Sequence, residues 1–109
     1  MVAMKLLKFV GSSLDDLRNF PHEARRVAGF ELRAVQNGLE PSDWKPMPVI
    51  GPGVNEIRIH VLGEWRVIYV AKLHNTVYVL HAFHKKTRKT SGHDIDIARQ
   101  RFRQIGGNL

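Results

Sequence analysis

Three consecutive segments with the alternation of β-strands constrain the fold of this chain most strongly. In VNEIRIHVL, Ile57, Ile59 and Val61 alternate with polar residues, as in a strand with one buried face. The segments EWRVIYVA and TVYVLHAF follow, and the short links between the three contain Gly63 and Asn75. Strands joined by short links pair antiparallel, so the pattern predicts a three-strand antiparallel meander. Its last strand is apolar on both faces, as expected of a central strand.

Two helices are predicted between an N-terminal strand and the meander. Residues 4–10, MKLLKFV, have strand-like apolar content, and Ser12 or Ser13 can cap a short helix through LDDLRNF. Pro21 suits the first position of a second helix, because its missing N–H would be unpaired there in any case. The apolar stripe of this second helix consists of Ala24, Ala28, Leu32, Val35 and Leu39.

The order of the elements predicts the fold class. Residues 40–53 are rich in proline and lack periodicity, which predicts a connecting loop. A C-terminal helix is indicated by Ile95, Ala98, Phe102 and Ile105. We therefore expect an α+β fold: a twisted antiparallel sheet of the N-terminal strand plus the meander, an N-terminal helical hairpin and a C-terminal helix. The helices are expected over one face, with the other partly open. A chain of 109 residues is expected to form one domain, 1–109.

The charge of the chain is large and unevenly distributed. The formal charge is +7, and residues 63–109 hold nine Lys or Arg against three Asp or Glu, hence +6. The electrostatic field of such a one-sided positive charge favours a polyanionic partner. The run FHKKTRKT, residues 83–90, places four cations directly after the last strand: Lys85, Lys86, Arg88 and Lys89. It is either a solvated basic loop or the rim of an active surface, and we favour the rim.

Cysteine content and hydropathy limit the class of protein and its location. The chain has no cysteine, which excludes a disulfide framework and a thiolate zinc site. The N-terminal MVAMKLLKFVG is interrupted by Lys5 and Lys8, unlike the apolar core of a secretory signal. No run of residues approaches the length of a membrane span. We therefore expect a cytoplasmic protein without a membrane partner.

The polar positions of the meander point to phosphodiester chemistry. Glu56, Arg58 and His60 share the polar face of the first strand, which is expected to be open; Arg66 lies across the turn. Because consecutive strands pair, these cations and the lysine pair of FHKKTRKT can converge on one surface suited to an RNA backbone. RNA cleavage needs no metal if the 2′-hydroxyl is the nucleophile, since a base, cations and an acid suffice. A lysine crowded by cations can act as base or acid, because its pKa falls.

Some side chains allow more than one interpretation. His60 and His81 fit hydrogen-bonding roles as well as proton transfer. On a strand, a spacing of three sends His81 and His84 to opposite faces, so neither a metal site nor a cofactor is expected. Tyr69 is a candidate general acid or RNA-stacking ring, or alternatively a residue on the core side of the sheet.

The motifs together resemble the RelE/HigB superfamily, in the phage-derived HigB-like branch of type II toxin–antitoxin systems. That branch shows an E-[IL]-R strand, an R-[VI]-x-Y strand, an L-h-x-F-x-K-K-T segment and a closing helix. Here these are Glu56-Ile57-Arg58, Arg66-Val67-Ile68-Tyr69, LHAFHKKT and DIDIARQRF. The resemblance covers about residues 50–105, with Ser91-Gly92 where the branch usually has a proline.

The resemblance implies a toxin that cleaves mRNA on the ribosome, inhibits translation and is neutralised by a HigA-like antitoxin with a helix-turn-helix domain. It places the two arginines and the lysine pair on the RNA-cleaving surface, with Tyr69 and His84 as candidates for the general acid. The catalytic candidates are therefore Arg58, Arg66, Lys85, Lys86, Tyr69 and His84. The RNA-binding candidates are His60, Arg88 and Lys89.

Two alternatives use the same residues without catalysis. In the ParE branch of the superfamily the same fold poisons DNA gyrase by binding it. A plain basic nucleic-acid-binding module is the other alternative, and its affinity would fall steeply with salt. Few aromatic residues lie on the expected open face, which argues against binding of single strands by stacking.

Overall fold

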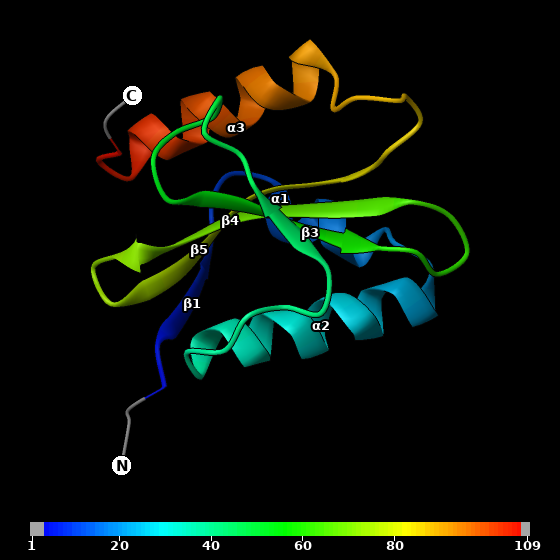
Figure 1. Ribbon diagram of the computed structural model, residues 1–109, viewed down its shortest axis with the longest axis horizontal. Helices are drawn as coiled ribbons and strands as arrows, with labels where there is room; N and C mark the ends of the chain where they lie inside the picture. Colours follow the sequence, from blue (N-terminus) through cyan, green and yellow to red (C-terminus); the bar gives the residue numbers. More distant parts are fainter. Residues whose placement is uncertain (1–3, 108–109) are drawn as a thin grey trace.

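One five-stranded sheet organises the protein, whose structure is a computed structural model that describes residues 4–107 (Figure 1). The strand order is β1-β5-β4-β3-β2. The strands are β1 (Leu6–Phe9), β2 (Trp44–Pro46), β3 (Val54–Ile59), β4 (Trp65–Leu73) and β5 (Thr76–His84). The helices are α1 (Ser13–Arg18), α2 (His22–Gln36) and α3 (Gly92–Gln104). The predicted α+β class, the β3-β4-β5 meander and the three helices are confirmed.

Helices cover both faces of the sheet. Figure 1 shows α3 on one side of the strands and α2 on the other. Ile57, Val67 and Val79 pack with α1 and α2, whereas Ile68 and Leu80 pack with α3. The expectation of helices on one face only was therefore wrong. Because β5 and the middle of β4 are apolar on both faces, each face needs its own covering layer.

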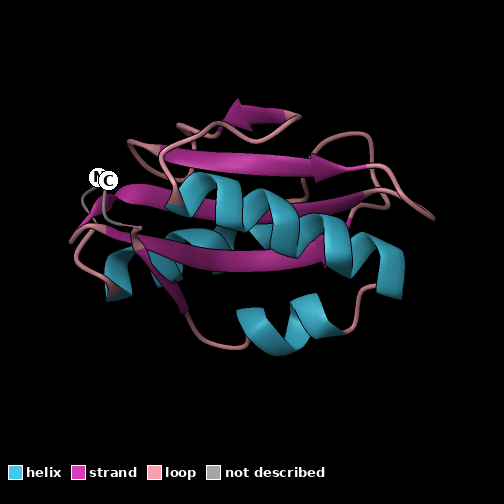
Figure 2. Cartoon of the chain, turned by 90° about the horizontal axis from the view of Figure 1, so that it is seen from below, coloured by secondary structure: helices cyan, strands magenta, loops and turns pink. Residues whose placement is uncertain are grey.

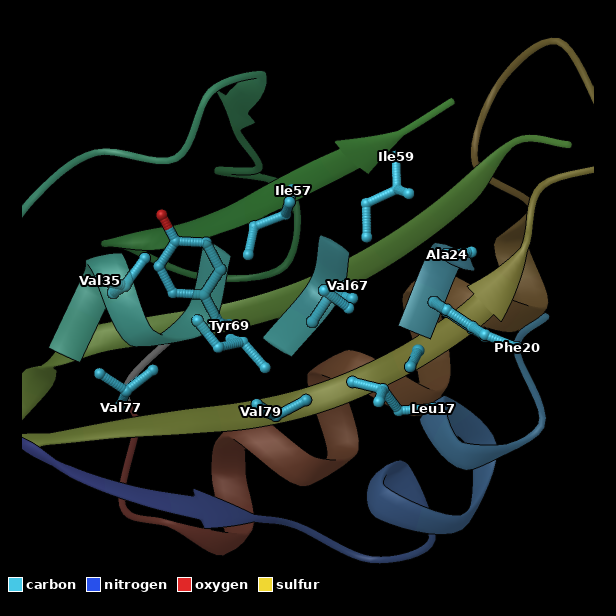
Figure 3. Packing of buried hydrophobic residues seen from close by; sticks show 13 residues of the cluster. Leu17, Phe20, Ala24, Val35, Ile57, Ile59, Val67, Tyr69, Val77 and Val79 are labelled. Atoms are coloured by element: carbon cyan, nitrogen blue, oxygen red, sulfur yellow. The ribbon is translucent and has the colours of Figure 1, made fainter. Parts of the chain in front are cut away.

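The larger core lies between α2 and the meander (Figure 3). Ala24 and Ala28 are fully buried, so the axis of α2 can approach the sheet closely. Leu39 was expected on the same stripe, but it is 64% exposed. The helix ends at Gln36, and Gly38, with φ +81°, turns the chain before Leu39 is reached.

Both edges of the sheet differ from the expected topology. β1 pairs parallel with β5, from Leu6 opposite Thr76 to Phe9 opposite Val79, so the sheet is mixed rather than wholly antiparallel. The chain between β1 and β5 includes α1, α2 and three strands, and this length permits the parallel direction. At the other edge, β2 forms inside the expected 40–53 loop and pairs antiparallel with β3 (Figure 2). Pro46 is tolerated there because an edge strand need not donate from every N–H.

The ring of Phe102 anchors α3 against two glycines. Phe102 is 2% exposed, and a Cβ atom at Gly51 or Gly107 would overlap its ring. The helix begins after Ser91, whose Oγ accepts a hydrogen bond from the Asp94 N–H at 3.2 Å. This packing holds the proline-rich loop against α3 and so fixes the position of β2.

No helix in the part of the chain that the structure describes is both long and apolar enough to cross a lipid bilayer.

Two glycine substitutions test the packing of Phe102. Gly51→Ala is expected to lower the free energy of unfolding by about 1–3 kcal/mol, because the added methyl group displaces a buried ring. Gly29→Ala, on the exposed side of α2 with no atom within 4 Å of the added Cβ, is expected to raise it by about 0.5–1 kcal/mol. Urea denaturation of both variants measures these changes, and an unchanged Gly51→Ala protein would contradict the packing described.

Candidate functional site

The two arginines of the meander lie directly opposite each other. Arg58 on β3 is the register partner of Arg66 on β4. Their neighbours Ile57 and Val67 belong to the core under α2, so both arginines point toward the α3 side of the sheet. The predicted meeting of Arg58 and Arg66 is confirmed. Their exposure differs, because the Arg58 side chain is 33% exposed and the Arg66 side chain only 5%.

A buried carboxylate lies between these arginines. Glu56 was expected on an open face, but it is 0% exposed. Its Oε1 lies 3.5 Å from Nε of Arg66 and 3.9 Å from Nε of Arg58. Its Oε2 accepts a hydrogen bond from Oγ1 of Thr90 at 2.9 Å. A buried carboxylate needs such partners, so Glu56 joins β3, β4 and the segment before α3.

Arg66 is held by the protein and is not the open cation that the sequence suggested. Its Nη1 donates to the carbonyl of Trp65 at 2.9 Å, and its Nη2 donates to Oε1 of Glu64 at 3.1 Å. With Glu56 on its third side, the guanidinium is neutralised and buried. The expectation failed because strand alternation gives the face of a side chain, and that face is covered here.

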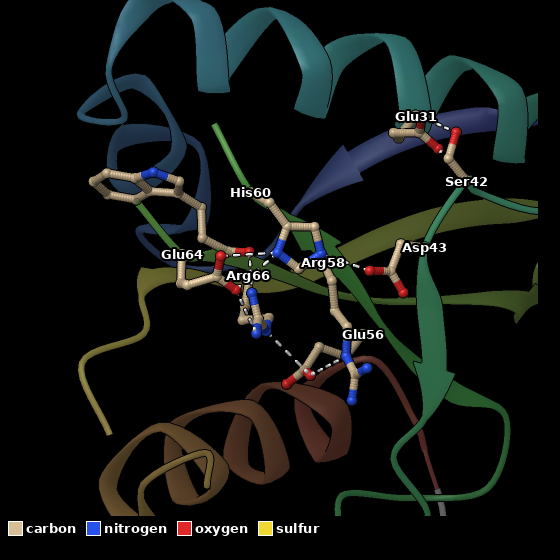
Figure 4. A network of polar contacts seen from close by, with 9 residues as sticks. Glu31, Ser42, Asp43, Glu56, Arg58, His60, Glu64 and Arg66 are labelled. Carbon is tan, nitrogen blue, oxygen red and sulfur yellow. Dashed lines mark hydrogen bonds and ion pairs between the residues drawn. The ribbon is translucent and has the colours of Figure 1, made fainter. Parts of the chain in front are cut away.

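His60 connects two carboxylates at the edge of the site (Figure 4). Its Nε2 lies 2.6 Å from Oδ2 of Asp43, and its Nδ1 lies 2.8 Å from both carboxylate oxygens of Glu64. Glu31 on α2 accepts hydrogen bonds from the N–H and hydroxyl of Ser42 at 2.6 and 2.8 Å, which anchors the segment carrying Asp43. Hydrogen bonds to Asp43 and then Glu64 raise the pKa of His60. The same bonds lower the pKa of each carboxylate.

These contacts form one continuous series of alternating charges, which we call the ion-pair chain. In order, it contains Asp43, His60, Glu64, Arg66, Glu56 and Arg58. Figure 4 shows how it crosses from the segment after α2 to the middle of the sheet. Three carboxylates oppose two arginines and one histidine, so the chain itself carries little net charge.

The 85–90 segment supplies the uncompensated positive charge. The backbone N–H of Lys85 donates to the Glu64 carbonyl at 2.7 Å, which places this lysine beside the ion-pair chain. Burial and then the charge of Arg66 lower the pKa of Lys85. Within residues 4–107, no carboxylate forms an ion pair with the cations of this segment. We call Arg58, Lys85, Lys86, Arg88 and Lys89 the cationic surface.

Both candidates for the general acid lie on the other face of the sheet. Tyr69 is 2% exposed in the core under α2, and burial raises its pKa to about 12. His84 stacks on Trp65, with ring centroids 4.3 Å apart, and Trp65 in turn packs against Phe20 of the α2-side core. The structure therefore confirms the alternative considered for Tyr69, a residue on the core side of the sheet, and its position does not support the role of general acid. His84 lies next to Lys85 in sequence but projects to the opposite face.

Several residues of the site were missed in the sequence. Glu64, Asp43 and Lys45 were assigned no role, although Glu64 is adjacent to the turn before Arg66 and the charge of Lys45 helps to lower the pKa of Lys85. Little in the sequence indicated a role for Asp43 and Lys45, because they lie in the segment expected to be a loop. His81 pairs with Asp94 of α3 at 2.7 Å and fits the hydrogen-bonding role considered for it. Among residues 4–107, no group of three or more His, Cys, Asp or Glu side chains could hold a metal ion.

A mixed sheet with an N-terminal helical pair, a closing helix and cations at one end is compatible with the RelE-like class of folds. Residues 15–103 match the family model described as "Phage derived protein Gp49-like (DUF891)". The match covers most of the chain, so the protein belongs to this Gp49-like family, which is RelE-like and toxin-like. Such a family implies an antitoxin partner in general terms. A search of curated proteins gave no match.

Replacing one hydroxyl tests the role of the buried carboxylate. Thr90→Val removes the hydrogen bond to Glu56 and is expected to lower the free energy of unfolding by about 1–3 kcal/mol. Thr87→Val is the matched control, because it removes a hydrogen bond from the Thr87 hydroxyl to the Lys89 carbonyl that is exposed on the same segment, where water can replace it. Urea denaturation measures both variants, and equal changes in the two would show that Glu56 does not depend on Thr90.

The titration of His60 tests the ion-pair chain. We expect its pKa above 6.5 in the wild type and closer to 6.5 in Glu64→Gln, with Glu40→Gln as the exposed control. A raised histidine pKa stabilises the fold below pH 6.5, and this stabilisation is lost as the pH rises through the raised value. Lowered carboxylate pKa values stabilise the fold above pH 3.8 for Asp43 and 4.5 for Glu64. NMR titration gives the values, and a His60 pKa insensitive to Glu64→Gln would contradict the geometry.

Proposed function

We propose that the protein is a toxin that cleaves mRNA on the ribosome without a metal ion and thereby inhibits translation. The observation that carries this proposal is the gathering of Arg58, Lys85 and the exposed cations of the 85–90 segment around one end of the sheet. Membership of a toxin-like family supports the toxin part of the proposal. Dependence on ribosomes implies a cytoplasmic site of action.

The opposite pKa shifts of two neighbouring groups suggest the assignment of base and acid. Lys85 has a lowered pKa and His60 a raised one. The two residues are neighbours through Glu64, whose carbonyl accepts from the backbone N–H of Lys85 and whose carboxylate contacts the His60 ring. Groups whose environments separate their pKa values are suited to paired proton transfer. We therefore assign Lys85, in its neutral form, as the base and protonated His60 as the acid. His60 would donate through Nε2, whose present partner is the partly exposed carboxylate of Asp43.

The proposed reaction follows from these assignments. Lys85 takes the proton of the 2′-hydroxyl, whose oxygen attacks the adjacent phosphorus. The bond from phosphorus to the 5′ oxygen breaks, and His60 supplies the proton for that oxygen. The products are a 2′,3′-cyclic phosphate and a 5′-hydroxyl end. Arg58 stabilises the charge on the phosphorane, and the exposed Lys86 adds positive charge next to Lys85 in the sequence. Arg66 acts as a positioning residue through Glu64 and Glu56.

The finer assignment, to the HigB-like branch of type II systems, is part of this proposal. The antitoxin proposed is HigA-like, with a helix-turn-helix domain. The exposed cations Arg88 and Lys89 would bind the RNA that flanks the scissile bond, because they follow Lys85 along the same segment.

Cleavage of mRNA on purified ribosomes tests the proposed function. Lys85→Ala/Lys86→Ala is expected to cut at least about 10²-fold more slowly than the wild type, because it removes a proton-transfer group. Lys8→Ala/Lys72→Ala removes the same charge from exposed positions on β1 and β4 and should cut as the wild type does. Mapping of transcript 5′ ends, with a test for 5′-hydroxyl groups, measures the rate.

Three outcomes would contradict the nuclease. Equal rates and equal ends for the wild type and Lys85→Ala/Lys86→Ala would exclude Lys85 as the base. Inhibition of purified gyrase with intact mRNA would indicate a ParE-like toxin instead. Binding of RNA without product, with an affinity that falls steeply with salt, would indicate a plain basic module.

A further inference from the structure

A groove of about 310 Å³ lies beside the cationic surface. One wall comes from β2 and the residues after it, and the other comes from the 85–90 segment and the start of α3. Its apolar lining is Met47, Val49 and Ile95. Its cations are Lys45, Arg88 and Lys89. An apolar strip between positive walls suits a ligand that is flat, apolar on its faces and attached to anionic groups.

The groove and the cationic surface share a wall. Thr90 lines the groove, and its hydroxyl donates to Glu56, the carboxylate beside Arg58 and Arg66. Lys45, on the facing wall, is close enough to Lys85 for its charge to contribute to the lowered pKa of that lysine. A ligand that leaves the groove past Thr90 therefore meets the proposed catalytic cations.

We propose that this groove binds the base of a nucleotide adjacent to the scissile phosphate of an RNA substrate. The inference rests on the proposed function and names a base-binding subsite for it. The methionine thioether can contact an aromatic ring, and the guanidinium of Arg88 can stack on a base. Lys45 and Lys89 would contact the flanking phosphates.

The size of the groove favours a base over a protein segment. A volume of about 310 Å³ is at the lower end of the range for small-ligand sites. A helix with its side chains is about 10–12 Å across and needs a longer apolar trough. Val49 is 47% exposed while Met47 is 6% exposed, so the lining has an accessible rim and a buried floor. One flat group can lie between them.

Oligonucleotides with and without bases test this subsite. The probe is a trinucleotide with 2′-O-methyl groups, which cannot supply the attacking hydroxyl, and its control is the abasic trimer with the same phosphates. We expect the trimer with bases to bind at least about tenfold more tightly than the abasic trimer. The methyl groups of Met47, Val49 and Ile95 should shift in NMR spectra only with the former. Equal affinities, or unshifted methyl groups, would overturn the proposal.

A matched pair of variants locates the contact. Val49→Glu places a carboxylate at the rim of the groove, and Leu39→Glu adds the same charge at an exposed position beyond α2. Val49→Glu should weaken binding of the trimer about tenfold or more, while Leu39→Glu should change it by less than about twofold. Equal weakening by both variants would assign the effect to net charge and overturn the subsite.

The outcomes separate this proposal from the proposed function. Ribosomal cleavage that Val49→Glu leaves at the wild-type rate and sequence pattern would overturn the subsite and keep the nuclease. Base-dependent binding in the groove without any cleavage would keep the subsite and reject the nuclease. If a Glu-rich peptide shifts the groove methyl groups and the trimer does not, the groove is a peptide site and the proposal fails.

Discussion

The buried carboxylate of Glu56 is the constraint on which the candidate site depends. A charge without solvent contact persists only if other groups of the protein compensate it, and here two arginines and a hydroxyl do so. These partners come from β3, from β4 and from the segment that leads into α3. The hydrogen bond from Thr90 to Glu56, together with the two ion pairs, therefore sets the position of the cationic segment relative to the sheet. A surface segment rich in lysine would otherwise have little apolar contact to order it.

The site has an inner neutral layer and an outer positive layer. The ion-pair chain neutralises the arginines of the meander, so the net charge of the second half of the protein is displayed mainly by the 85–90 segment. This separation has a chemical use, because the inner layer fixes geometry while the outer layer attracts a polyanion. His60 and Lys85 lie where the two layers meet. Hydrogen bonds to Asp43 and Glu64 raise the pKa of His60, whereas burial and the charge of Arg66 lower the pKa of Lys85.

Sequence patterns predicted the features that neighbouring residues determine, such as the hairpin register. They missed the features that depend on contacts between residues far apart in the sequence. The short link at Gly63 was enough to place Arg58 against Arg66, because a hairpin fixes register. The burial of Glu56 was missed, since alternation gives the direction of a side chain and not what covers it. The same limit explains why the packing of α3 on the second face of the sheet was not predicted. The sequence showed that β5 is apolar on both faces, but no local pattern specified which helix covers the second one. The proline-rich residues 40–53 concealed β2 because edge pairing needs few backbone donors.

The parallel pairing of β1 with β5 also affects the order in which the protein folds. Leu6 is the register partner of Thr76, so the contact between these two strands closes a long loop of intervening chain. Such long-range contacts form late, because closing the loop costs conformational entropy. The β3-β4-β5 meander, by contrast, forms from neighbours. We expect the meander and α2 to assemble early, and the sheet to be completed last, when its first strand joins. Until β1 joins, one edge of β5 is unpaired, and the far end of that strand leads directly to the lysines of the proposed active surface.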